Sequence, residues 1–224
     1  MQLFRGPRAA EYRVGAKAVL PFAAVIATVG VLFGYLARAA GLSPLAAVLM
    51  SGTTFAGSAQ FAAVAVLAGG GTAWAAVSAS ALLNARYLPL GLAIAPALRG
   101  PFWKRLLLAQ FVVDETWAVA YIGAGRFSRE RLVGSGLVLY ATHIAATAIG
   151  AVAATVPGDL SAWGLDSAFP ALFVVLLWPH LRGLSRVAAA LLGAMIALSL
   201  TPLTPPGIPV IAAAFACFLG AKGG

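Results

Sequence analysis

The sequence predicts an all-α, polytopic membrane helix bundle, and three observations lead to this fold class. Of its 224 residues, 62% are hydrophobic and only 9% are charged, whereas a typical soluble domain is about 45–50% apolar and about 25% charged. The mean hydropathy is +0.96. The apolar residues also form runs near the roughly 20 residues that a helix needs to cross a bilayer. A soluble enzyme, a disordered chain and a disulfide scaffold are therefore excluded, the last because Cys217 is the only cysteine.

Seven to eight hydrophobic segments follow one another in a single transmembrane domain that covers residues 1–224. Each segment ends at glycine, proline or basic residues, which usually punctuate helices. The segments are Ala18–Leu36, Pro44–Leu67, Ala73–Leu98, Leu106–Ala124, Leu132–Val156, Ser167–Trp178, Val187–Leu200 and Ile208–Leu219. A short basic N-terminus of residues 1–17 precedes them, and the first segment is expected to be a retained span because no clear cleavage site follows it.

The distribution of lysine and arginine predicts which segments are irregular. The N-terminus carries four of these residues, and the loops Arg99–Arg105 and Arg126–Arg131 carry three each. An excess of positive charge marks cytoplasmic loops, so the N-terminus is expected in the cytoplasm. Eight simple crossings would then place Arg99–Arg105 outside. The conflict disappears if Pro44–Leu67 and Leu106–Ala124 are broken or re-entrant, because irregular backbone at membrane depth is tolerated where it lines a cavity or is buried in protein.

Ionisable residues inside apolar segments are candidates for function. A charge at the bilayer centre costs about 2.5–3.5 kcal/mol on insertion scales. Arg86, with Asn84 beside it, lies in the third segment, Asp114 and Glu115 lie in the fourth, and His143 lies in the fifth. One acid is expected to pair with Arg86 or a partner subunit and the other to face a wet cavity, because adjacent helical residues point about 100° apart. These acids or His143 could carry a proton; the alternative is that they only fix helix packing.

The second segment combines glycines with polar side chains around residues 51–60. If this stretch is unwound, its free N–H and C=O groups would bind the carboxylate and ammonium of a zwitterion, with Arg86 as a rival carboxylate partner. The alternative is that the glycines serve only close helix packing. The predicted substrate-binding residues are Gly52, Gly57, Ser58, Gln60, Asn84 and Arg86, and the predicted proton-coupling residues are Asp114, Glu115 and His143.

Several of these motifs resemble the AzlC family in order and spacing. They are Phe55–Phe61 (FAGSAQF), Leu83–Tyr87 (LNARY) and Asp114–Thr116 (DET), followed by a later signature in Gly164–Phe173. The resemblance covers roughly residues 15–200. It implies the large subunit of a proton-driven exporter of valine, leucine, isoleucine and often methionine, acting without a cofactor. It also implies a small AzlD-like membrane subunit as partner and a multi-pass location in the bacterial inner membrane.

Two positions depart from the family pattern. Tyr87 stands where the family usually has histidine, and Val113 stands where it often has threonine. If that histidine moves protons in the family, this chain needs another route, or His143. Two other functional classes remain as alternatives. An intramembrane enzyme would need a nucleophile or metal cluster that the sequence does not offer, and a structural or assembly subunit would tolerate loss of the polar residues. The transported amino acid and the direction of transport stay open.

Overall fold

The computed structural model describes residues 7–154, 174, 178, 181, 183–204 and 208–216. Within these residues every named element is a helix, and extended backbone pairs only in an isolated antiparallel bridge between Tyr121 and Phe127. The predicted all-α fold class is therefore confirmed. The chain divides into two compact units, which are Met1–Gly57 with Asn84–Thr155 and Ser58–Leu83 with Val156–Gly224.

Two helices in the described part of the chain are long and apolar enough to cross a membrane. They are α2 (Leu20–Ala39) and α9 (Arg129–Ala153), within a few residues of the predicted first and fifth segments. A third crossing is reached if the broken pair Ala73–Asn84 and Tyr87–Ala97 counts as one span. The predicted count of seven to eight segments is thus not confirmed. Its sixth segment, Ser167–Trp178, lies almost wholly outside the described residues.

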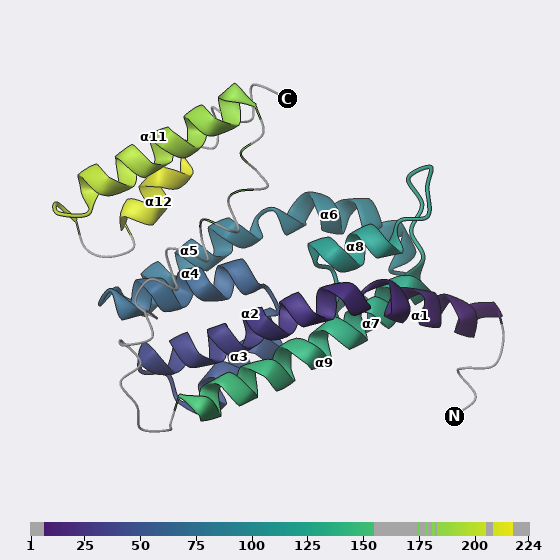
Figure 1. The fold of residues 1–224 in the computed structure, drawn as a ribbon. Helices are drawn as coiled ribbons and strands as arrows, with labels where there is room; N and C mark the ends of the chain where they lie inside the picture. The colour runs from purple at the N-terminus through teal and green to yellow at the C-terminus, as the bar shows by residue number, and fades with distance from the viewer. Residues whose placement is uncertain are drawn as a thin grey trace. The chain divides into compact units, whose positions relative to one another are not determined.

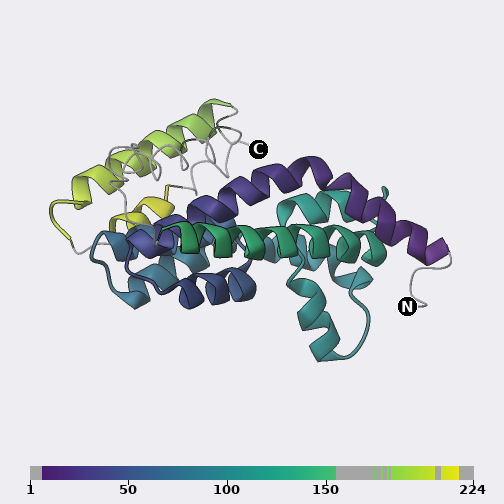
Figure 2. The ribbon, with the colours of Figure 1, turned by 60° about the horizontal axis from the view of Figure 1, so that its bottom comes forward.

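The first unit is built on α2 and α9, which lie side by side along their lengths (Figure 1, Figure 2). Gly30 and Gly34 on α2 and Gly150 on α9 allow this approach. A Cβ on any of the three would fall within 3.0 Å of atoms of the facing helix, closer than real Cβ atoms come. Small residues let helices in lipid pack backbone against backbone. We call this contact the glycine seam.

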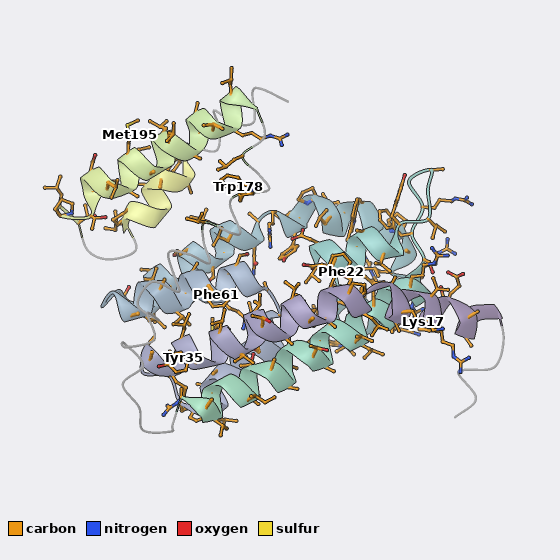
Figure 3. The ribbon with its side chains drawn as sticks, in the orientation of Figure 1. Lys17, Phe22, Tyr35, Phe61, Trp178 and Met195 are labelled. Atoms are coloured by element: carbon orange, nitrogen blue, oxygen red, sulfur yellow. The ribbon has the colours of Figure 1, made fainter. Side chains whose placement is uncertain are left out.

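The described part of the basic N-terminus forms helix α1 (Pro7–Ala18), which packs along the start of α9. Figure 3 labels Lys17 near the end of α1 and Phe22 and Tyr35 on α2. Arg131 Nε donates a hydrogen bond of 2.6 Å to the Glu11 carboxylate. This bond holds the pKa of Glu11 below its ordinary value. It ties the N-terminal helix to the first turn of α9.

The second predicted segment is broken, as the charge distribution indicated. Helix α3 (Pro44–Thr54) starts at a Ser43 cap and ends at Phe55, whose φ is +39°. This left-handed conformation is uncommon for a bulky residue and stops the helix. Helix α4 (Gly57–Ala68) begins two residues later.

The fourth predicted segment is also broken. Helix α7 (Phe102–Ala109) and helix α8 (Asp114–Ala120) are separated by residues 110–113. Asp114 and Glu115 therefore lie in the first turn of a short helix rather than in the middle of a span. Residues 121–124, predicted as the end of this segment, are not helical.

The third predicted segment, Ala73–Leu98, is also broken, although the charge distribution pointed only to the second and fourth segments. Helix α5 (Ala73–Asn84) ends two residues before α6 (Tyr87–Ile94), which runs into a 3₁₀ turn, η1 (Ala95–Ala97). Pro89 explains the break. It has no N–H, and its ring would clash with the Ala85 carbonyl of a continuous helix. That carbonyl instead accepts from Leu88 N at 3.1 Å.

The second unit holds two described helix pairs. Helices α4 and α5 are joined by a hydrogen bond of 2.8 Å from Ser80 Oγ to the Ala59 carbonyl. Helix α11 (Leu184–Leu200) packs on α12 (Ile208–Ala214), and these helices correspond to the predicted seventh and eighth segments. Figure 3 marks Phe61 on α4 and Met195 on α11. Residues 217–219, the predicted end of the eighth segment, lie outside the described residues.

Candidate functional site

A cavity of about 570 Å³ lies in the first unit where the three helix breaks meet. Each break supplies part of its wall. The residues are Thr54 and Phe55 at the end of α3, Asn84 and Tyr87 beside the start of α6, and Gln110, Val112 and Val113 between α7 and α8. Small-molecule sites usually measure about 300–1,000 Å³. In a membrane protein, interrupted helices around a cavity are the usual setting of a binding site.

Most of the remaining wall is apolar and comes from the stretches on either side of the loop 98–101. These residues are Leu88 and Gly91 from α6, Ala95 from η1, Leu98 directly after η1, and Phe102, Leu106 and Ala109 from α7. Arg105 is the one charged residue among the described lining residues. The cavity thus combines a large apolar surface with a few polar groups, a composition that suits a small molecule with one apolar end.

Gln110 connects two of the three breaks. Its Nε2 donates to the carbonyls of Gly52 at 3.2 Å and Thr53 at 3.0 Å. The last carbonyls of a helix have no partner within it, so Gln110 satisfies groups that the end of α3 leaves free. Tyr140 on α9 adds a second bond of 2.6 Å to the Gly52 carbonyl. The end of α3 is therefore held by side chains and does not offer all of its carbonyls to a ligand.

Arg86 and Asp114 form an ion pair, as one of the sequence hypotheses predicted. Arg86 Nη2 lies 3.2 Å from Asp114 Oδ2, and the two side chains are 41% and 48% exposed. The same nitrogen donates to the Tyr87 hydroxyl at 3.0 Å, and the guanidinium lies 4.9 Å from the centre of the Tyr87 ring. Tyr87 lines the cavity and Arg86 does not. The ion pair is thus adjacent to the cavity through Tyr87.

Asn84 is the one predicted substrate-binding residue that lines the cavity directly. Its Oδ1 is buried and has no hydrogen-bond partner among the described residues. Buried polar atoms are nearly always paired in native proteins, and this acceptor is an exception on a residue of the cavity wall. Glu115, the second predicted proton carrier of α8, is half-buried beside Asp114.

Val113 precedes α8 at the position where the family resemblance leads one to expect threonine, and Thr116 makes the hydrogen bonds at the start of this helix. Valine cannot accept a hydrogen bond, and the backbone N–H of Val113 instead donates to Thr116 Oγ1 at 3.0 Å. That hydroxyl also lies near the carbonyls of Val113 and Phe111. The buried Thr116 side chain therefore fixes the turn that leads from the break into α8.

His143 lies in a separate buried cluster between α3 and α9. It is 2% exposed, and its Nε2 lies 3.4 Å from Ser51 Oγ, which is 2.8 Å from Thr147 Oγ1. The rings of Phe33 and Phe55 pack against it. The structure therefore does not bring His143 together with Asp114 in one site, although Phe55 contacts His143 and also lines the cavity.

The other predicted residues are distributed over both units. Gly52 contributes its carbonyl to Gln110 and Tyr140. Gly57 opens α4, and a Cβ added at this glycine would lie 3.5 Å from the Val29 side chain. Ser58 and Gln60 belong to the second unit, in which Gln60 is fully buried.

Sequence reasoning missed three residues that shape the site, namely Gln110, Arg105 and Tyr140. Gln110 is a polar residue at the start of a break, and this signal was available because the fourth segment was expected to be irregular. Arg105 was interpreted only as a loop charge that sets orientation. Tyr140 carried no signal, because its role depends on a contact with a residue 88 positions away.

Comparison with known proteins identifies the family and several relatives of this chain. The family model described as AzlC protein matches residues 21–156. An uncharacterized membrane protein of Archaeoglobus fulgidus is 32% identical over 219 residues, covering 93% of each chain. The inner membrane protein YgaZ of Escherichia coli K12 is 29% identical, covering 87% of this chain and 84% of its own.

A third relative is named for an activity. The branched-chain amino acid transport protein AzlC of Bacillus subtilis 168 is 26% identical over 170 residues, covering 75% of this chain and 66% of its own. No solved structure matches. Since the family model spans more than half of the chain and a relative with 32% identity covers nearly all of it, the chain belongs to the AzlC family.

Proposed function

We propose that this protein is a secondary transporter that exports branched-chain amino acids across the cytoplasmic membrane. The observation that carries the proposal is the meeting of three helix breaks around one largely apolar cavity. A binding site at broken helices needs only small rearrangements to face either side of the membrane. The name of the relative from Bacillus subtilis supports the substrate class.

The cavity wall suits valine, leucine, isoleucine and the similarly apolar methionine in its chemistry. Leu88, Leu98 and Leu106 offer aliphatic surface for the side chain. Burying apolar area is worth about 25 cal/mol per Å², so a branched side chain gains more here than that of alanine. The amino and carboxyl groups need the few polar residues of the wall.

Proton coupling is proposed for the Arg86–Asp114 pair. Each residue neutralises the other at 3.2 Å. Protonation of Asp114 would remove the charge that compensates Arg86, so the pair would weaken directly beside Tyr87, a residue of the cavity wall that accepts a hydrogen bond from Arg86. Glu115 and His143 remain further candidates for proton transfer.

Orientation and partnership follow from the same proposal. With the N-terminus in the cytoplasm, the basic loop 99–105 lies on the cytoplasmic side, and Arg105 places the cavity next to that loop. A small AzlD-like membrane subunit is the proposed partner. Co-purification of a small hydrophobic protein from the native membrane checks this part, and recovery of the chain alone in active form contradicts it.

Efflux from loaded cells tests the transport function. Cells loaded with labelled leucine and expressing this chain with its partner are expected to lose the label faster than cells with an empty vector. Arg86→Ala and Asp114→Asn are expected to abolish the acceleration while the protein stays in the membrane. Equal efflux with and without the chain contradicts transport, whereas normal flux in both variants removes only the ion pair from the mechanism.

A further inference from the structure

We propose that Arg105 binds the carboxylate, and Asn84 the ammonium group, of the amino acid in the cavity. This assignment rests on the proposed function and adds to it the orientation of the substrate. It also moves the carboxylate contact from Arg86, the sequence-based candidate, to a residue of α7.

The ion pairing of the two arginines favours Arg105 as the partner of the substrate carboxylate. Arg86 already has Asp114 at 3.2 Å, so a substrate carboxylate would have to displace an acid from it. Arg105 forms no ion pair with any residue that the structure describes, and it lines the cavity. Guanidinium binds carboxylate through two parallel N–H donors. A carboxylate that enters the cavity therefore meets an arginine without a competing acid.

The ammonium group matches a second part of the wall, which Asn84 and the end of α3 supply. Asn84 Oδ1 is a buried acceptor without a partner in the described structure. Leaving such an atom unsatisfied is unfavourable, and an ammonium group carries three donors. Thr54 and Phe55 bring the C-terminal end of α3 to the same cavity, and a helix C-terminus carries partial negative charge that favours a cation.

Among the described lining residues, the part of the wall that would contact the substrate's side chain is aliphatic and offers no partner for a charge. None of the described lining residues is acidic, and Arg105 is their one basic residue. A lysine side chain would bring a second cation into the cavity without a counter-charge. The site is therefore expected to select zwitterions with an uncharged, apolar side chain.

Binding of three ligands to the purified complex, measured by calorimetry, tests the carboxylate contact and the ammonium contact one at a time. Leucine carries both charged groups, leucinamide lacks the carboxylate, and 4-methylpentanoate lacks the ammonium. Arg105→Gln is expected to weaken leucine binding by about tenfold or more and to leave leucinamide unchanged. Asn84→Leu is expected to weaken leucine and leucinamide to a similar degree and to leave 4-methylpentanoate unchanged.

Lys104→Gln is the matched control. Lys104 is the neighbouring basic residue on α7, it carries the same charge as Arg105, and it does not line the cavity. The control is expected to bind all three ligands like the unchanged protein. Unchanged leucinamide binding in Arg105→Gln also shows that this variant keeps its folded cavity.

The outcomes separate this assignment from the proposed function. If the unchanged protein binds no leucine, the proposed function and the assignment both fail. If it binds leucine and Arg105→Gln binds leucine equally well, only the assignment fails. A parallel loss of leucinamide in Arg105→Gln, or an equal loss of leucine in Lys104→Gln, also overturns it, because the effect would then not depend on the carboxylate.

Discussion

The glycine seam and the cavity region of the first unit are both built from helices, but the helices pack in opposite ways. Along the seam, α2 and α9 are continuous and approach so closely that a single Cβ would meet backbone atoms. Around the cavity, α3, α6, α7 and α8 are short and end at breaks. The seam satisfies its backbone groups inside each helix, whereas the breaks depend on side chains such as Gln110 and Thr116.

This difference indicates that the continuous helices stabilise the unit and the broken helices form its binding site. Continuous helices need no outside partners for their backbone, and in a membrane such partners are scarce. Broken helices expose polar backbone, which is tolerated where a cavity or specific side chains receive it. Substitutions are therefore expected to act on stability at the seam and increasingly on function toward the cavity.

The largest effect on stability is expected from Gly34→Ala in the seam. Its Cβ would overlap the Thr147 carbonyl oxygen and lie 2.7 Å from Ala151 N. Because neither backbone can move without separating α2 from α9, we expect a loss of about 3 kcal/mol or more. Thermal unfolding in detergent measures this loss. Gly91→Ala is the control, since nothing lies within 4 Å of that position, and its stability should be equal or higher.

A smaller loss is expected from Gln110→Ala at the junction of two breaks. The Thr53 carbonyl loses its donor and the Gly52 carbonyl keeps only Tyr140. These two bonds are exposed and part-buried, so the expected loss is that of an ordinary hydrogen bond, about 0.5–1.5 kcal/mol. Gln110→Glu should be worse, because a carboxylate would face two carbonyl oxygens. Hydrogen exchange at residues 52–56 should rise in both variants; unchanged protection would show that the amide does not hold α3.

Asp114→Asn is expected to change stability by less than about 1 kcal/mol. The ion pair with Arg86 is nearly half exposed on both sides, and such pairs contribute little. Leucine efflux, in contrast, is expected to be lost completely in this variant. A large drop in the unfolding temperature with the flux retained would reverse this interpretation and assign the pair to packing.

The smallest effect is expected at Glu11, and it should depend on pH. The hydrogen bond from Arg131 lowers the pKa of Glu11 from its ordinary value of 4.5. A carboxyl group with a lowered folded-state pKa contributes stability above its ordinary pKa and loses that contribution as the pH falls through the lowered value. Glu11→Gln should therefore be slightly less stable than the unchanged protein at neutral pH, with the difference vanishing in acid. A difference that grows in acid contradicts the assignment.

The continuous elements could be predicted well because their signal is local. The long apolar runs of α2 and α9 give their approximate ends, and the glycines and polar residues near positions 52–60 indicate the break at Phe55. The break before α6 also had a local signal in Pro89. This signal was not used, because the segment is long enough for a span and its polar residues, Asn84 and Arg86, were interpreted as binding groups.

The site could be predicted only in part because its contacts join distant positions. Charge alone suggested that Arg86 needs an acid, and Asp114 is that acid. No local pattern could indicate that Gln110 reaches the carbonyls of Gly52 and Thr53, 58 and 57 positions away. Nor could it show that Arg105, rather than Arg86, lines the cavity.

Phe55 is the partition between the hollow and the dry part of the unit. Its ring lines the cavity, and its centre lies 5.1 Å from that of Tyr140 and 5.8 Å from that of His143. A left-handed backbone costs a residue with a Cβ roughly 1–2 kcal/mol, and glycine would avoid that cost. The chain nevertheless holds a phenyl group there. Phe55 therefore stands between the hollow and the imidazole, lining the one and packing against the other.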